Sequence, residues 1–279
     1  LAARVLPLAH GTTRAVVSLV AGSPADLQTR LGVIADLAET DASVLGAHLE
    51  GPFLDPGHHG AHDPALLVDP TPDAIEALIA AARGSLVQVT LAPELPGGLD
   101  AIARLTDAGV VVAVGHTSAD ADLARDAFEA GATLLTHAFN AMPGLHHRAP
   151  GPVGAATGDP RVTIEVIADG VHVHPDVIRI LFAAAPGRIA LVTDAMAAAG
   201  AADGTYRLGS LSVTVQAGVA RLADGTIAGS TLTQDAALRT AVAAGVPLPA
   251  AVTALTTTPA RTIGRPDLGS LAVGAVADA

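Results

Sequence analysis

The sequence contains no cysteine, no lysine and no tryptophan, and aromatic residues make up only 2% of it. Without thiols the protein has no thiolate metal ligand and no cysteine nucleophile. Without lysine it has no Walker-type phosphate loop, no Schiff base and no modified-lysine bridge between two metals. All 15 basic residues are therefore Arg. The groups left for catalysis are His, Asp, Glu, Ser, Thr and a metal ion.

The remaining composition is that of a large α/β domain. The 279 residues are enough for one large barrel, and half of them are hydrophobic. With so few aromatics the core must be built from Ala, Val, Leu and Ile, which suits buried parallel strands under small-residue helices.

The charge and the apolar runs limit the partners. A net charge of −12 argues against non-specific binding to nucleic acid but leaves room for a small anionic substrate held by local Arg and His groups. We find no signal peptide and no uninterrupted apolar run of membrane-spanning length. Together with the absence of Cys, this predicts a soluble, cytoplasmic protein that does not bind membranes.

Short apolar runs rich in β-branched residues alternate with amphipathic segments along the chain. We expect strands at 15–20, 44–49, 86–91, 110–114, 133–136, 162–167 and 189–192. Helix-start signals lie between them, at Ser23-Pro24, Thr71-Pro72, Ser118-Ala119-Asp120 and His174-Pro175, with Ser118 as the expected cap of its helix. This alternation predicts a parallel sheet with right-handed crossovers, as in a TIM-like (β/α)8 barrel.

Two regions depart from that rhythm. Residues 206–227 read as short strands with turns at Gly218 and Asp224-Gly225, and we interpret them as a hairpin inserted into the barrel. Seven strands are one short of a closed barrel. We assign residues 1–265 to the catalytic barrel and 266–279 to the start of a C-terminal β-sandwich segment.

Four polar residues, Glu50, His116, His137 and Asp194, stand at or just after the ends of expected strands. In a strand–helix barrel those ends meet on one face, where active sites are built. Glu50, His116 and His137 would give three protein ligands and an open position for water, the pattern of a catalytic metal site. Zn²⁺ is the default ion, although Fe, Mn, Co or Ni could use the same ligands.

Each of these residues also has a structural interpretation. Glu50 could face solvent or pair with an Arg, either His could be a hydrogen-bonded core residue, and Asp194 could cap a helix. The functional interpretation of Asp194 is a general base that deprotonates water and then protonates a leaving group. His62, in the polar loop 55–63, would lie at the mouth as part of a lid. Arg148 could bind an anionic group such as a phosphate or could be a solvated loop residue.

An ordered set of motifs resembles the N-acetylglucosamine-6-phosphate deacetylases of the amidohydrolase superfamily. The motifs are HLEGPF at 48–53, GAH at 60–62, LAPE at 91–94, GHT at 115–117, THAFNAM at 136–142, RAPG at 148–151, ADGVH at 168–172, LVTDA at 191–195 and AGS at 228–230. No single motif is decisive, but the ordered set covers most of the chain.

The resemblance implies a metal-dependent hydrolase that converts N-acetylglucosamine 6-phosphate into glucosamine 6-phosphate and acetate. Glu50, His116 and His137 would hold the metal, Asp194 would be the general base and acid, and His62 would stabilise the oxyanion. The residues implied to line the sugar-phosphate site are Ala61, His62, Asn140, Ala141, Arg148, Asp169, His172, Ile227, Ala228 and Gly229. A homodimer is also implied, with Arg148 and His172 as the phosphate ligands.

The sequence departs from this family at one point. Many members carry a His-X-His pair on the first barrel strand for a second metal, whereas His10 is followed by Gly11-Thr12. We interpret the first strand and most of the small β-sandwich as lying outside this chain, so that one or two metal ions remain open. The alternatives are a related amidohydrolase acting on an unphosphorylated N-acetyl sugar or a cyclic amide, and a non-catalytic sugar-phosphate-binding barrel.

Overall fold

The computed structural model describes residues 2–276 and divides into two compact units, Arg14–Ala156 and a second unit that joins the N-terminal segment to residues from Thr157 onward. Both units alternate parallel strands with helices, which confirms the expected α/β class. None of the helices in residues 2–276 has the length and apolar character needed to cross a bilayer.

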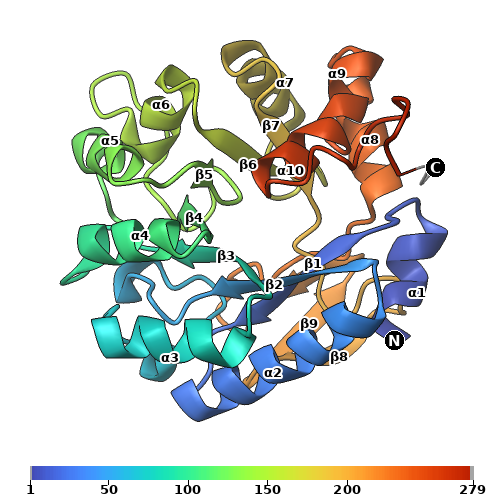
Figure 1. Ribbon diagram of the computed structural model, residues 1–279. Coiled ribbons are helices and arrows are strands. Elements are labelled where there is room, and N and C mark those ends of the chain that lie inside the picture. Colours follow the sequence, from blue (N-terminus) through green and yellow to red (C-terminus); the bar gives the residue numbers. More distant parts are fainter. Residues whose placement is uncertain (1, 277–279) are drawn as a thin grey trace. The chain divides into compact units, whose positions relative to one another are not determined.

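The unit Arg14–Ala156 is built on five parallel strands that pair in sequence order (Figure 1). The strands are β1 (Ala15–Val20), β2 (Val44–Glu50), β3 (Leu86–Leu91), β4 (Val111–Val114) and β5 (Leu134–Leu135). The helices are α2 (Pro24–Thr40), α3 (Pro72–Ala82), α4 (Gly98–Asp107), α5 (Ala121–Glu129) and α6 (Gly151–Gly158), and two short 3₁₀ turns, η1 (Pro56–His58) and η2 (Pro64–Leu66), follow β2.

The core of this unit follows from the spacing of apolar residues. Helix α2 buries Leu27, Leu31 and Ile34, which recur every three or four residues and so share one face. Helices α2 and α3 pack against each other beside β1 and β2 (Figure 1). Phe53, directly after β2, is 1% exposed and fills the core where that strand ends.

The helix starts follow the sequence signals with one exception. The side chains of Ser23 and Thr71 accept hydrogen bonds from backbone amides at the first turns of α2 and α3, as expected. The cap of α5 is Asp120 and not Ser118, because the Asp120 carboxylate accepts from the amides of Asp122 and Leu123 at 3.0 and 2.9 Å.

The second unit contains the parallel pair β6 (Thr163–Ile167) and β7 (Ile189–Val192) and a three-stranded antiparallel sheet of β8 (Gly204–Leu208), β9 (Leu211–Gln216) and β10 (Val219–Arg221). Its helices are α1 (Ala2–Ala9), α7 (Pro175–Ala184), α8 (Gln234–Ala243), α9 (Leu248–Thr253) and α10 (Thr257–Thr262), of which α8 and α10 pack on β7. The antiparallel strands occupy the range in which the sequence predicts short strands. The domain boundary at residue 265 stays a prediction, and the segment assigned to 266–279 extends past the described residues.

Candidate metal centre and active site

Three of the four strand-end residues meet in the unit Arg14–Ala156. Glu50 is the last residue of β2, while His116 and His137 follow β4 and β5 by two residues each. The Oε1 atom of Glu50 lies 2.9 Å from His137 Nε2 and 3.3 Å from His116 Nε2, and the two Nε2 atoms are 3.0 Å apart. All three side chains are buried.

This donor set fits a divalent cation. Ligands bound tetrahedrally to Zn²⁺ at its usual distance lie about 3.3 Å from one another, close to the three distances observed here. Burial alone would raise the pKa of Glu50, but the imidazoles of His116, His137 and His62 lower it well below its ordinary value. Burial lowers the pKa of His116. The carboxylate and the neutral imidazole are the protonation states that bind a metal.

The tautomer of His116 points to the same conclusion. Its Nδ1 lies 2.9 Å from the carbonyl oxygen of His58, which can only accept a hydrogen bond. His116 can therefore donate to Glu50 from Nε2, and so lower its pKa, only as an imidazolium; in the neutral ring the proton is on Nδ1 and the lone pair on Nε2 faces the carboxylate. Two acceptors in contact are stabilised by a cation between them, and an imidazole held from its outer nitrogen is typical of metal ligands.

Both histidines sit on left-handed backbone. The φ angle is 48° at His116 and 23° at His137, a region that costs energy for residues with a side chain. Gly115, directly after β4, allows the chain to pass close to Thr136, because a Cβ at this position would lie 2.0 Å from the Thr136 side chain. Residues held in such conformations cluster at functional sites, and these two are held where their rings meet.

His62 joins this cluster, and its burial differs from our expectation of a lid. It is 5% exposed, with Nε2 3.5 Å from Glu50 Oε2. The backbone N–H of Ala21, just after β1, donates to His62 Nδ1 at 3.3 Å. Because Nδ1 accepts, the neutral ring carries its proton on Nε2, where it can donate to a carboxylate or a carbonyl oxygen.

Glu94 holds the segment that follows His116, a role that its place in the sequence does not predict. Its carboxylate accepts from the Thr117 hydroxyl at 2.5 Å, the Ser118 amide at 2.5 Å and the Ser118 hydroxyl at 3.0 Å. These bonds hold the two residues that follow His116. The only signal in the sequence was the place of Glu94 after β3, in the LAPE motif.

His48 is a second residue that received no role. It lies two residues before Glu50 on β2, and its ring nitrogens are each 2.9 Å from a hydroxyl, Ser18 Oγ on β1 and Thr90 Oγ1 on β3. The strand period of two places His48 on the same face as Glu50, which is the signal that could have found it.

The other predicted residues of this unit lie in the loops after η1 and β5. Asn140 Nδ2 donates to the carbonyl oxygens of His137 and Ala138. The carbonyl oxygen of Ala141 accepts from Thr117 N. Ala61 is half-buried next to His62, whereas Arg148 lies on an exposed loop with its amide donating to His146 Nδ1.

The remaining predicted residues belong to the second unit. Asp194 follows β7 with φ 48°, and its carbonyl oxygen accepts from Ser230 N at 2.7 Å. The described residues between β7 and β8 form no helix, so the alternative interpretation of Asp194 as a helix cap is wrong.

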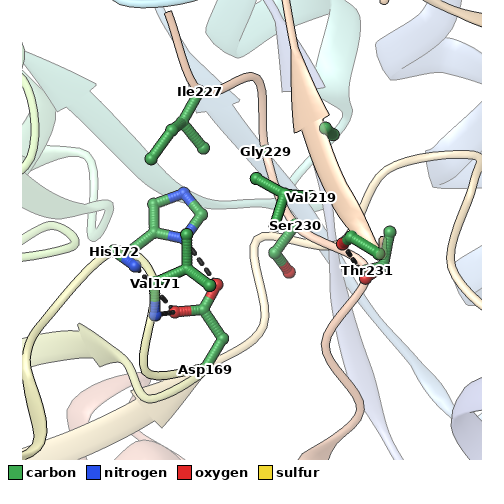
Figure 2. A pocket seen from close by; sticks show the side chains of 10 residues that line it. Asp169, Val171, His172, Val219, Ile227, Gly229, Ser230 and Thr231 are labelled. Carbon is green, nitrogen blue, oxygen red and sulfur yellow. Dashed lines mark hydrogen bonds and ion pairs between the residues drawn. The ribbon is translucent and has the colours of Figure 1, made fainter. Parts of the chain in front are cut away.

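Four of the residues predicted to line the sugar-phosphate site surround a small cavity in this unit (Figure 2). Asp169, His172, Ile227 and Gly229 line it. Ala228, between the last two, is buried, and its amide donates to the Ala220 carbonyl. The loop after β6 and the segment after β10 therefore line one small cavity, and their part in a sugar-phosphate site stays a prediction.

The chain is similar to known proteins over most of its length. Residues 8–279 match the model of the amidohydrolase family. Over 84% of the chain, the sequence is 46% identical to N-acetylgalactosamine-6-phosphate deacetylase of Escherichia coli O157:H7, and over 95% it is 38% identical to N-acetylglucosamine-6-phosphate deacetylase of Vibrio furnissii. The chain spans 62% and 67% of the lengths of these two relatives.

A solved structure is similar over nearly the whole chain. It is an Asp-to-Ala variant of Mycobacterium smegmatis N-acetyl-D-glucosamine-6-phosphate deacetylase in complex with N-acetyl-D-glucosamine-6-phosphate. The match has 48% identity and a TM-score of 0.94, and it covers 99% of this chain and 74% of that one. The chain therefore belongs to the amidohydrolase family, in the group of the N-acetylglucosamine-6-phosphate deacetylases.

Proposed function

We propose that this chain is the catalytic part of a metal-dependent deacetylase that hydrolyses N-acetylglucosamine 6-phosphate to glucosamine 6-phosphate and acetate. The observation that carries the proposal is the buried cluster of Glu50, His116 and His137. It is supported by relatives named for this reaction over most of the chain.

In this proposal Glu50, His116 and His137 hold the metal, for which Zn²⁺ is the first candidate. When bound, such an ion supplies Lewis acidity that polarises a carbonyl group and makes water a better proton donor. The Nε2–H of His62, set by the amide of Ala21, donates to the acetamide oxygen as negative charge develops there.

Asp194 is proposed to move the proton. Its carboxylate takes a proton from the attacking water and delivers it to the nitrogen of the leaving amine as the C–N bond breaks. Arg148 and His172 are proposed to bind the 6-phosphate, and Ala61, Asn140, Ala141 and the segment Ile227, Ala228, Gly229 to contact the sugar. The family resemblance also supports a homodimer, which sedimentation of the purified protein would test. The cytoplasmic location predicted from the sequence would be tested by cell fractionation.

A second substrate has a specific observation in its favour. The Escherichia coli relative at 46% identity is named for N-acetylgalactosamine 6-phosphate, the epimer at C4. We therefore include that sugar as the alternative substrate of the same site.

The decisive assay compares the two phosphorylated N-acetyl sugars with unphosphorylated N-acetylglucosamine on the metal-loaded protein. We expect acetate release from a phosphorylated sugar, its loss after chelation and its return with Zn²⁺. Arg148→Ala should raise KM for the phosphorylated sugar. An unchanged KM would refute the role of Arg148, and absence of acetate from all three sugars would refute the proposed function.

Asp194 offers a sharper test of the mechanism. Asp194→Asn should lower kcat by about a thousandfold, within the range for loss of a general base, while the metal content measured by elemental analysis stays the same. Asp126→Asn, on the exposed face of α5, is the matched control and should keep full activity. A fully active Asp194→Asn enzyme would exclude the proposed proton transfer.

A further inference from the structure

Both oxygens of the Asp169 carboxylate accept hydrogen bonds from its own loop. Its Oδ1 accepts from the backbone amides of Val171 and His172, both at 2.8 Å, and its Oδ2 accepts from His172 Nδ1 at 2.6 Å (Figure 2). The Asp169 side chain is 16% exposed. Burial would raise the pKa of Asp169, but the bonds from His172 and the two amides lower it, so the group is a carboxylate.

His172 is the group that faces the cavity. Its side chain is 7% exposed, and its Nδ1 is committed to Asp169. The other ring nitrogen, Nε2, points away from Asp169 toward Ile227 (Figure 2). Ile227, Gly229 and Ser230 line the same space, in which Asp169 and His172 are the only titratable residues among those that the structure describes.

The two residues therefore have different relations to a ligand. Nδ1 of His172 is bonded to Asp169, which leaves Nε2 for a ligand, whereas each oxygen of Asp169 already accepts at least one hydrogen bond from its own loop. We propose that Asp169 is a positioning residue that acts on the sugar phosphate through His172, and not the direct sugar contact that the family resemblance implies. This inference rests on the proposed function for the identity of the ligand.

The chemistry explains why a carboxylate is needed. A phosphate oxygen requires an N–H donor, and with Nδ1–H held by Asp169 the ring offers one at Nε2 only as an imidazolium. Asp169 on one side and the phosphate on the other both stabilise that cation, and a charge-assisted bond is about twice as strong as a neutral one.

The variant Asp169→Asn removes the negative charge of the side chain but keeps its size and its ability to accept hydrogen bonds. Its amide oxygen can still accept from Val171 and His172, so the loop keeps its turn. The amide nitrogen then donates to Nδ1, and His172 binds the phosphate as a neutral Nε2–H donor. We expect about tenfold weaker binding of the phosphorylated sugar. The matched control is Asp159→Asn in the loop before β6. The Asp159 carboxylate also accepts a hydrogen bond from the backbone amide two residues later, that of Arg161, at 2.9 Å, but Asp159 does not line the cavity.

The experiment measures Kd by calorimetry on the metal-loaded, full-length protein with D-glucosamine 6-phosphate and with D-glucosamine. Because this ligand has no acetyl group, binding is scored independently of deacetylation. We expect Asp169→Asn to weaken binding of the phosphorylated sugar about tenfold, Asp159→Asn to leave it unchanged, and binding of D-glucosamine to change less than twofold in either variant.

A double-mutant cycle then identifies the route of the effect. If Asp169 acts through His172, Asp169→Asn should add less than twofold to the loss seen in His172→Gln. A further tenfold loss in that background would mean that Asp169 contacts the ligand itself, and the inference would be overturned. Normal binding without acetate release in the deacetylase assay would refute the proposed function alone.

Discussion

His48 gives the most quantitative prediction, because it is buried next to the metal centre with its two ring nitrogens bonded to the strand hydroxyls of Ser18 and Thr90. Burial lowers the pKa of His48 from 6.5 to about 4, only partly opposed by the charge of Glu50 and reinforced by the neighbouring imidazoles. His48 is therefore neutral in the folded protein over a pH range in which it is protonated in the unfolded chain.

The sign of the effect follows from proton linkage. Above pH 6.5 the ring is neutral in both states and contributes nothing. Between pH 6.5 and about 4 the unfolded chain binds a proton that the folded protein does not. The free energy of unfolding therefore decreases as the pH is lowered through this range. The full difference corresponds to about 3 kcal/mol, of which about 2 kcal/mol is lost between pH 7.5 and pH 5.

The assay is urea unfolding at these two pH values, with a chelator present so that metal binding does not contribute. His48→Gln can still bond to the hydroxyls but does not titrate. We expect its loss of stability between pH 7.5 and 5 to be smaller than that of the wild type by about 2 kcal/mol. His174→Gln is the control, since the His174 side chain is 71% exposed.

Two results would refute the reasoning. One is the same pH dependence in the wild type and in His48→Gln. The other is an NMR titration in which the His48 ring takes up its proton above about pH 6, near the ordinary value for an exposed imidazole.

Three further predictions concern stability, each measured by urea unfolding at neutral pH. Phe53→Ala, at a position 1% exposed, should cost about 3–5 kcal/mol, and a loss below about 1 kcal/mol would mean that the core collapses around it. Gly46→Ala should lower the free energy of unfolding far more than Gly84→Ala, because the new Cβ at position 46 would lie 2.3 Å from the Ser85 carbonyl oxygen while the Cβ at position 84 meets open space. An equal loss of stability in the two variants would mean that backbone strain alone, and not this clash, is the cause. Asp120→Ala should cost about 1 kcal/mol and Ser118→Ala should leave α5 intact, and the reverse order would restore Ser118 as the cap.

The strands were predictable because their sequence is nearly unambiguous. Each expected run matches an observed strand to within one residue at either end, since buried parallel strands require continuous β-branched stretches. The convergence of Glu50, His116 and His137 followed from the same pattern, because parallel strands in one sheet end at one edge.

The remaining features depend on contacts between residues far apart in sequence. Ser118 has the residue type of a cap, but Glu94, from the loop after β3, takes both its hydroxyl and its amide. His62 stands in a polar loop that reads as exposed, yet the amide of Ala21 and the carboxylate of Glu50 hold it inside. Local propensity cannot show such partners.

The three proposed metal ligands all belong to the unit Arg14–Ala156. During synthesis, domains fold in order from the N-terminus. Glu50, His116 and His137 are therefore synthesised before the strands β6 and β7. If this unit folds before the second unit is complete, a divalent cation can bind to it before the rest of the chain has folded.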